Sequence, residues 1–151
     1  MSPSITLLED SLCKWFAKKI GFNDSSGGIA ASGGTLSNLN ALIAARHNSG
    51  LGSDPNSVLL VSEDAHSSFI KCIRIMGLDE ANLIRIKTDN NGSIDIQNLR
   101  KTIDRCFIDK KKIFAIVATL GTTVRGAIDP IKDISEICKE RNIWLHIDGS
   151  I

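Results

Sequence analysis

The feature that most constrains the fold of this chain is a regular alternation of apolar, β-branched segments with segments of helical periodicity. Short runs rich in valine, isoleucine and leucine predict buried strands at residues 58–61, 83–87, 113–119 and 143–148. Apolar residues recur at helical spacing in the intervening segments 66–76, 95–107 and 130–141. Because each predicted strand reaches the next through a helix, the alternation predicts an α/β fold of three layers with a mostly parallel sheet.

The segment before the first strand predicts two further helices joined by a loop. Apolar residues recur at helical spacing from Ile5 to Phe16, and Gly21 is a favourable helix end. A glycine- and serine-rich stretch over residues 25–35 then leads into a helix at residues 36–48. No repeat or low-complexity segment divides the chain, and 151 residues with 42% hydrophobic and 23% charged content fit a single domain, residues 1–151.

Two aspartates are predicted to start helices. Asp95 is placed to cap a helix that ends near Phe107. Asp129 is followed by Pro130, and an aspartate N-cap with proline at the first helical position is a strong start signal for a helix that ends at Arg141. Both carboxylates are therefore expected to accept hydrogen bonds from backbone N–H groups at the start of the helix that follows each of them.

Charge and cysteine content exclude several classes of function. The net charge is +1 and the basic residues are scattered, so neither a nucleic-acid partner nor a membrane surface is expected. The four cysteines form no CxxC pair, which argues against a metal site or disulfides and favours reduced, mostly buried thiols. Glu9 and Asp10 interrupt the region where a signal peptide would be apolar, and no apolar run is long enough to span a bilayer, so a cytoplasmic location is expected.

Polar side chains follow three of the predicted strands. Strand 58–61 leads to His66, strand 113–119 ends at Thr119, and strand 143–148 ends at Asp148. In open parallel sheets, ligands bind beyond the carboxyl ends of the strands. These three side chains are therefore expected to face one crevice.

Each candidate also has a structural interpretation. Asp148 follows a buried strand, where a cationic cofactor nitrogen would offset its desolvation, but an aspartate in this position often caps a turn. His66 could stack on a planar ligand or take a proton, or it could be a polar residue near a helix start. His146 is predicted to point away from its two apolar neighbours and to pair inside the sheet, whereas His47 is predicted to face solvent.

The loop before the second helix is a candidate phosphate site. Backbone N–H groups around Gly34 and Thr35 and the positive end of the helix dipole could bind a phosphate, and the Thr35 hydroxyl could add a donor. Glycine loops precede many helices without this role. The loop also lacks the GxGxxG pattern and a strong preceding strand, which argues against a dinucleotide site.

Four groups of motifs occur in a fixed order along nearly the whole chain. They are Ser32-Gly33-Gly34-Thr35-Leu36-Ser37-Asn38-Leu39 with Ala44-Ala45-Arg46, Asp64-Ala65-His66-Ser67-Ser68, Ala118-Thr119-Leu120-Gly121-Thr122-Thr123 with Gly126-Ala127-Ile128-Asp129-Pro130, and Trp144-Leu145-His146-Ile147-Asp148. In order and spacing the chain resembles the group II pyridoxal-phosphate-dependent amino-acid decarboxylases, which include the glutamate, cysteine-sulfinate, diaminobutyrate, histidine and aromatic amino-acid enzymes.

The resemblance implies a cofactor site and a fold. The fold would be part of the large domain of the aspartate-aminotransferase-like, fold type I enzymes, and the cofactor would be pyridoxal 5'-phosphate. Gly34 and Thr35 would hold its phosphate, His66 would stack on the pyridine ring and Thr119 would lie close to the ring. Asp148 would pair with the protonated ring nitrogen, so His66 and Asp148 are the predicted catalytic residues.

The resemblance also implies that the chain is incomplete as a catalyst. The Schiff-base lysine of such enzymes lies downstream of the Asp148 motif, so the chain alone is expected to be inactive, and the full-length enzyme is expected to be a homodimer. The first hypothesis is therefore a piece of an amino-acid carboxy-lyase, and the second is a catalytically dead remnant or interaction module that keeps the fold. The motif at residues 126–130 is closer to the glutamate, sulfinate and diaminobutyrate branch than to the aromatic one.

Overall fold

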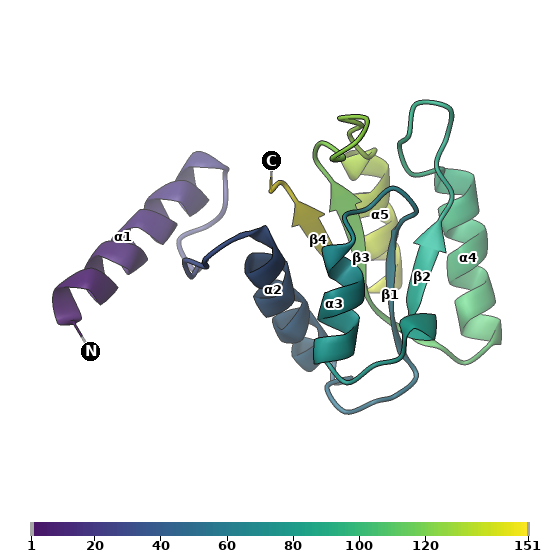
Figure 1. The fold of residues 1–151 in the computed structure, drawn as a ribbon, viewed down its shortest axis with the longest axis horizontal. Coiled ribbons are helices and arrows are strands. Elements are labelled where there is room, and N and C mark those ends of the chain that lie inside the picture. The colour runs from purple at the N-terminus through teal and green to yellow at the C-terminus, as the bar shows by residue number, and fades with distance from the viewer. Residues whose placement is uncertain (1, 151) are drawn as a thin grey trace. The chain divides into compact units, whose positions relative to one another are not determined.

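The structure, a computed structural model, describes residues 2–150 and contains two compact units (Figure 1). The first unit ends at Ser37 and the second begins at Asn38, within one continuous helix, α2 (Gly34–Asn48). Each unit is described by itself below. The proposed strand-end residues all lie in the second.

The first unit contains α1 (Pro3–Lys19), a connecting segment and the first turn of α2. The predicted helical pattern is confirmed, and the chain leaves α1 through Gly21 at a φ of +86°, a left-handed conformation that glycine adopts at little cost. The carboxylate of Glu9 accepts a hydrogen bond of 2.8 Å from the backbone N–H of Ala30. Only Ala17 of α1 is buried, so its apolar side chains are largely exposed.

The second unit is built on a four-stranded parallel sheet. The strands are β1 (Ser57–Ser62), β2 (Leu83–Ile86), β3 (Lys112–Thr119) and β4 (Trp144–Asp148). Their order in the sheet is β2-β1-β3-β4, and every neighbouring pair is parallel. All four predicted strands are thereby confirmed within one or two residues at each end.

Helices cover both faces of this sheet and give the predicted three layers. The connections contain α3 (Ser68–Ile75), a short 3₁₀ helix η1 (Glu80–Asn82), α4 (Ile96–Ile108) and α5 (Ile131–Arg141). Helices α2 and α3 pack on one face, and α4 and α5 pack on the other (Figure 1). Such a layered arrangement follows from right-handed crossovers between parallel strands.

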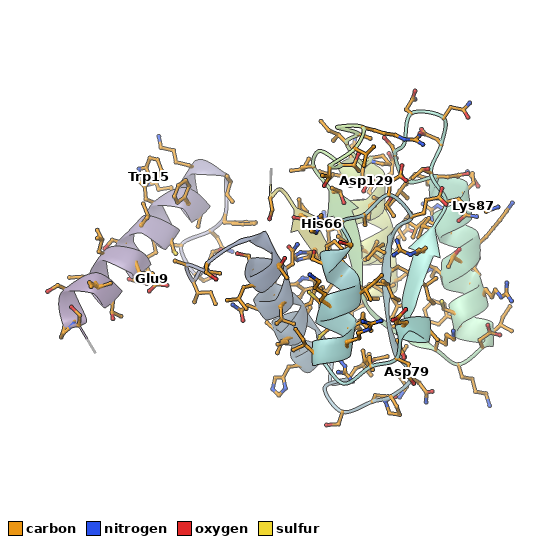
Figure 2. The ribbon with its side chains drawn as sticks, viewed as in Figure 1. Glu9, Trp15, His66, Asp79, Lys87 and Asp129 are labelled. Carbon is orange, nitrogen blue, oxygen red and sulfur yellow. The ribbon has the colours of Figure 1, made fainter. Side chains whose placement is uncertain are left out.

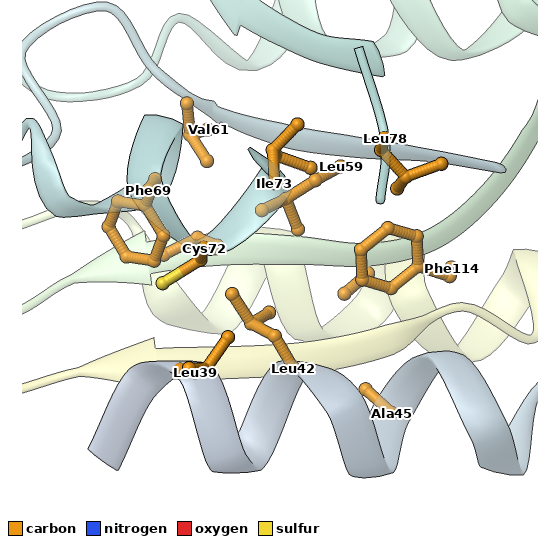
Figure 3. Packing of buried hydrophobic residues seen from close by; sticks show 12 residues of the cluster. Leu39, Leu42, Ala45, Leu59, Val61, Phe69, Cys72, Ile73, Leu78 and Phe114 are labelled. Carbon is orange, nitrogen blue, oxygen red and sulfur yellow. The ribbon is translucent and has the colours of Figure 1, made fainter. Parts of the chain in front are cut away.

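The core has two parts, one on each face of the sheet. Along β3, Ala115 and Val117 point to the α2 and α3 side, whereas Ile116 and Ala118 point to the α4 and α5 side. Figure 3 shows the first part, where Leu42 of α2 and other apolar side chains of α2 and α3 pack against the strands. A fully buried side chain of this size contributes about 1.5–3 kcal/mol. Central strands are thus buried on both sides, which is why they are continuously apolar in sequence.

Several helix starts differ from the sequence predictions, and α2 begins at Gly34, two residues before its predicted start. Helix α3 begins at Ser68, two residues after the predicted start at His66. The prediction that Asp129 caps α5 is wrong, because Pro130 occupies the N-cap position and α5 begins at Ile131. The Asp129 side chain instead accepts two hydrogen bonds from more distant backbone groups. The Asp95 cap is confirmed by its bonds from the N–H groups of residues 97 and 98.

A buried arginine closes the amino-terminal end of the sheet. Arg46 as a whole residue is 6% exposed. Its guanidinium donates to the carbonyl oxygens of Leu51, Asp54 and Met76 and to the hydroxyl of Ser57, at 2.9–3.0 Å. One side chain therefore joins α2, the loop before β1 and the end of α3.

The predicted burial of most of the cysteine thiols is confirmed. Three of the four cysteines are buried: Cys72, Cys106 and Cys138. Burial raises the pKa of the Cys138 thiol to about 11, so this group stays protonated at neutral pH. Within residues 2–150, no helix is both long and apolar enough to cross a bilayer.

Candidate functional site

The carboxyl ends of the parallel strands bring the predicted residues to one edge of the second unit. Thr119 and Asp148 are the last residues of β3 and β4 and are partners in the strand register. The carbonyl oxygen of Asp148 also accepts a hydrogen bond of 2.8 Å from the N–H of Leu120. His66 lies in the loop that follows β1, and Figure 2 shows it at the same end of the sheet as Asp129.

Asp148 supplies a buried negative charge at this edge. Its side chain is 6% exposed overall and, by strand alternation, points to the same face as His146. One carboxylate oxygen accepts a bond of 3.2 Å from the N–H of Ser150, so Asp148 also makes the turn contact expected of a strand-end aspartate. Its charge, together with the larger effect of burial, raises the pKa of the Cys72 thiol on α3.

His146 has a structural role beside this carboxylate. Its Nε2 lies 2.9 Å from the amide oxygen of Asn38, which can only accept, so the imidazole donates. Its partner is on α2, whereas the sequence analysis expected a neighbour inside the sheet. Burial lowers the pKa of His146 and the charge of Asp148 opposes that effect. His146 is thus held as a neutral donor between the sheet and α2.

Thr119 presents a hydroxyl without a partner. The residue is 5% exposed, and its Oγ1 has no hydrogen-bond partner among the described residues, as is also true of the Oγ of buried Ser68 at the start of α3. Buried polar atoms are paired in the great majority of cases, and exceptions often mark binding sites. Two such hydroxyls at the carboxyl edge fit a site that receives a polar ligand.

His66 is exposed and fixed at one ring nitrogen. Its Nδ1 accepts a hydrogen bond of 3.2 Å from the backbone N–H of Ser68. This contact satisfies one of the free N–H groups in the first turn of α3 and orients the imidazole at the carboxyl edge. Both interpretations from the sequence, a helix-start residue and a ring that meets a ligand, agree with this position.

Gly34 and Thr35 are the first residues of α2. The N–H groups of Leu36 and Ser37 both bond to the carbonyl of Gly33 at 3.0 Å, so the chain turns directly from the glycine loop into the helix. The N–H groups in the first turn of a helix suit an anion. Because both residues belong to the first unit, their place in a common site with the strand ends stays a prediction.

Asp129 and Ser68 are the residues at this edge that sequence reasoning missed. Asp129 is 2% exposed and its two carboxylate oxygens accept from the N–H groups of Ile94 and Thr119 at 2.8 and 2.7 Å. An aspartate before proline is typical of a helix start, and that local signal concealed a contact across 35 residues. The sequence does not indicate a role for Ser68, because this residue is distinguished only by a buried hydroxyl that has no hydrogen-bond partner among the described residues.

The candidate site contains no assembled metal centre in the part of the chain that the structure describes. No three histidine, cysteine, aspartate or glutamate side chains of residues 2–150 lie together as a possible ligand set. Its polar groups are a carboxylate, hydroxyls and an imidazole. Such groups suit an organic ligand with a cationic nitrogen and hydrogen-bonding substituents.

A parallel sheet between helix layers, with buried polar groups at the strand ends, defines the chain as an α/β protein of the class in which ligands bind beyond those ends. The family model described as "Pyridoxal-dependent decarboxylase conserved domain" matches residues 1–151. The chain therefore belongs to the pyridoxal-dependent decarboxylase family, as the sequence motifs predicted. Pyridoxal phosphate is the cofactor of this family.

Individual relatives agree with this assignment. The chain is 34% identical to an acidic amino acid decarboxylase GADL1 of Xenopus tropicalis, over 99% of this chain and 30% of the relative. It is 33% identical to an aromatic-L-amino-acid decarboxylase of Bacillus atrophaeus, over 95% of this chain and 30% of that protein. The chain thus spans about a third of the length of these relatives.

A solved structure confirms the fold class. The chain superposes with a TM-score of 0.93 and 28% identity on the glutamate decarboxylase domain of a diaminobutyrate-pyruvate transaminase and L-2,4-diaminobutyrate decarboxylase from Vibrio parahaemolyticus. That match covers 99% of this chain and 36% of the solved one.

Proposed function

We propose that this chain is the part of a pyridoxal-phosphate-dependent amino-acid carboxy-lyase that binds the cofactor ring and phosphate. One observation carries the proposal. Thr119 and Asp148 are neighbours in the register at the ends of β3 and β4, and there a buried hydroxyl without a hydrogen-bond partner among the described residues lies beside a buried carboxylate. Burial of the Thr119 hydroxyl is costly unless a ligand supplies a partner, whereas the Asp148 carboxylate accepts the bond from the N–H of Ser150. Membership in the family gives the identity of that ligand.

Each proposed residue has a physical task. Asp148 holds a carboxylate against the ring nitrogen and keeps that nitrogen protonated, because a nearby negative charge favours the charged form. The bound cofactor supplies an electron-accepting ring for the bond that breaks when carbon dioxide leaves. Thr119 donates or accepts a hydrogen bond at the ring substituents, and His66 covers the ring face. Gly34 and Thr35 bind the phosphate through the first turn of α2.

The substrate we propose is an acidic amino acid or diaminobutyrate. Support comes from the motif at residues 126–130 and from the acidic and diaminobutyrate decarboxylases among the relatives. An aromatic amino-acid decarboxylase is about equally similar, so the identities alone do not separate the branches. The complete enzyme is proposed to be a cytoplasmic homodimer in which residues outside this chain supply the cofactor-linked lysine.

The test is carbon dioxide release by the full-length gene product. The purified protein is incubated with pyridoxal 5'-phosphate and, separately, with glutamate, aspartate, cysteine sulfinate, 2,4-diaminobutyrate and an aromatic amino acid. Release is expected from a member of the acidic or diaminobutyrate group, and none from residues 1–151 alone. Asp148→Asn is expected to lower turnover by about 100-fold or more, as for loss of one charge aimed at the reacting system, whereas Asp133→Asn on the exposed side of α5 changes nothing.

Two outcomes would contradict the proposal. Full-length protein that folds but binds no cofactor and releases no carbon dioxide would favour the interaction module. Turnover that survives in Asp148→Asn would remove the role assigned to this carboxylate.

A further inference from the structure

We propose that Asp129 is a positioning residue that fixes the main chain of Thr119 and thereby aims the Thr119 hydroxyl and the adjacent Asp148 carboxylate into the site. This inference rests on the proposed cofactor role of Thr119 and Asp148. Asp129 itself touches no bound group in this account, because both of its carboxylate oxygens are already occupied by backbone N–H donors.

Two hydrogen bonds join Asp129 to the main chain of Thr119. Its Oδ2 accepts from the N–H of Thr119 at 2.7 Å, and its own N–H donates to the carbonyl oxygen of Thr119 at 3.0 Å. The Thr119 main chain is therefore held at both of its polar groups by one residue. With N–H and carbonyl fixed, Thr119 retains little backbone freedom, and its hydroxyl is limited to rotation about χ1.

The other carboxylate oxygen extends the contact to the segment after β2. Oδ1 accepts from the N–H of Ile94 at 2.8 Å, and the hydroxyl of Ser93 donates to the carbonyl of Ile128 at 2.8 Å. Leu120 and Ile128 also form an antiparallel bridge beyond β3. Asp129 thus ties together the segments that follow β2 and β3, both at the carboxyl edge.

Strand pairing carries this constraint to Asp148. Thr119 and Asp148 are partners in the register, and the N–H of Leu120 donates to the Asp148 carbonyl at 2.8 Å. A shift of Thr119 would therefore move the end of β4. One buried carboxylate positions both groups that the proposed site needs.

Burying the Asp129 carboxylate costs free energy, because burial disfavours its charged form. Asp129 is 2% exposed, and burial raises its pKa, with the charge of Asp89 adding to that effect while the two N–H donors oppose it. Asparagine would fill the same space but could accept only through one oxygen and would place an NH₂ group against an N–H donor. Asp129→Asn is therefore the variant that tests the two-sided contact.

The experiment compares three variants of the full-length protein. Amide hydrogen exchange of the peptides that contain Ile94 and Thr119 is measured without cofactor, and the dissociation constant for pyridoxal 5'-phosphate is measured by fluorescence titration. Asp129→Asn is expected to speed exchange in both peptides and to weaken cofactor binding by about 10-fold or more, as when the residues that orient a binding group are lost. The exposed Asp133→Asn is expected to change neither.

A third variant separates positioning from general loosening. Ile134→Val shortens a buried side chain of α5. Ile134 takes no part in the hydrogen bonds between Asp129 and the Thr119 main chain. If Ile134→Val weakens cofactor binding as much as Asp129→Asn, the positioning role is overturned. Unchanged exchange at Thr119 in Asp129→Asn would overturn it as well, whatever the cofactor result. Absence of any cofactor binding by the unmodified protein would contradict the proposed function, and the exchange result would still decide the contact.

Discussion

Buried polar groups at the two ends of the sheet differ in whether they have hydrogen-bond partners within the chain. At the amino-terminal end, the guanidinium of Arg46 donates hydrogen bonds to four acceptors, three of them backbone carbonyls. At the carboxyl end, the hydroxyls of Thr119 and Ser68 are buried without a partner. The first arrangement is complete within the chain, whereas the second leaves two hydroxyls without a partner among the described residues.

Because of this difference, we expect substitutions at the two ends of the sheet to change the free energy of unfolding by different amounts. A buried charged group that makes four hydrogen bonds is expensive to remove, because several charge-assisted bonds are lost together. An unpaired buried hydroxyl costs free energy as it stands, so removing it is expected to cost little. We therefore expect substitutions at the amino-terminal end to affect stability, and substitutions at the carboxyl end to affect ligand binding.

The largest effect is expected at Arg46. Arg46→Met should lower the free energy of unfolding by about 3–5 kcal/mol, because the buried acceptors lose a charged donor. Chemical denaturation of the variant measures this loss. Arg74→Met is the matched control, since its exposed ion pair with Glu80 should contribute less than about 1 kcal/mol. A loss below about 1 kcal/mol for Arg46→Met would remove the contrast between the two ends.

A smaller loss is expected where His146 meets α2. Asn38→Ala removes the acceptor of the buried Nε2 and should cost about 1–3 kcal/mol, the usual penalty for a buried donor left unpaired. The exposed Ser37→Ala on the same helix should change the free energy of unfolding by less than about 0.5 kcal/mol. Equal effects of the two substitutions would contradict the assigned contact.

The same histidine predicts a pH dependence. Burial lowers the pKa of His146 in the folded state, so between that pKa and the unfolded value of about 6.5 the unfolded chain binds more protons. Stability should therefore fall as the pH drops below about 6.5, by at most about 1.4 kcal/mol per pH unit for one group. Denaturation midpoints of the original chain and of His146→Gln, measured from pH 7.5 to 5, should converge as the pH falls. Parallel curves would show that another group titrates.

The smallest effect on stability is expected at Thr119. Thr119→Val keeps the shape and removes the unpartnered hydroxyl, so the chain without cofactor should be unchanged or more stable by up to about 1 kcal/mol. The same substitution in the full-length protein should weaken cofactor binding. A clear loss of stability without cofactor would mean that the hydroxyl has a partner within the chain.

The layers and strands were predictable because their signals are local. Runs such as residues 113–119 are apolar throughout, and the turn and cap residues around them bound each element, as the Asp95 cap shows. Periodicity says nothing about which distant groups meet. Sequence therefore located Thr119 and Asp148 at strand ends but could not reveal that they are register partners or that Asp129 binds Ile94.

Asp129 and His146 show why local patterns misassign such residues. An aspartate before a proline predicts a cap, yet burial at 2% exposure and two long-range N–H donors redirect its side chain. For His146, alternation predicted the direction of the ring correctly and the partner incorrectly, because α2 supplies the acceptor. In both cases tertiary packing decided the partner. The role of Gly34 and Thr35 depends on the motif resemblance and stays a prediction.

The most direct test of the central claim is a crystal structure of the full-length protein with pyridoxal 5'-phosphate bound. We expect a carboxylate oxygen of Asp148 within about 3.2 Å of the ring nitrogen, the range of a hydrogen bond, and the Thr119 Oγ1 in contact with the same ring. The bound phosphate should lie at the N–H groups of Gly34 and Thr35. A cofactor seated elsewhere, with the Asp148 carboxylate turned away from the ring nitrogen, would contradict the account.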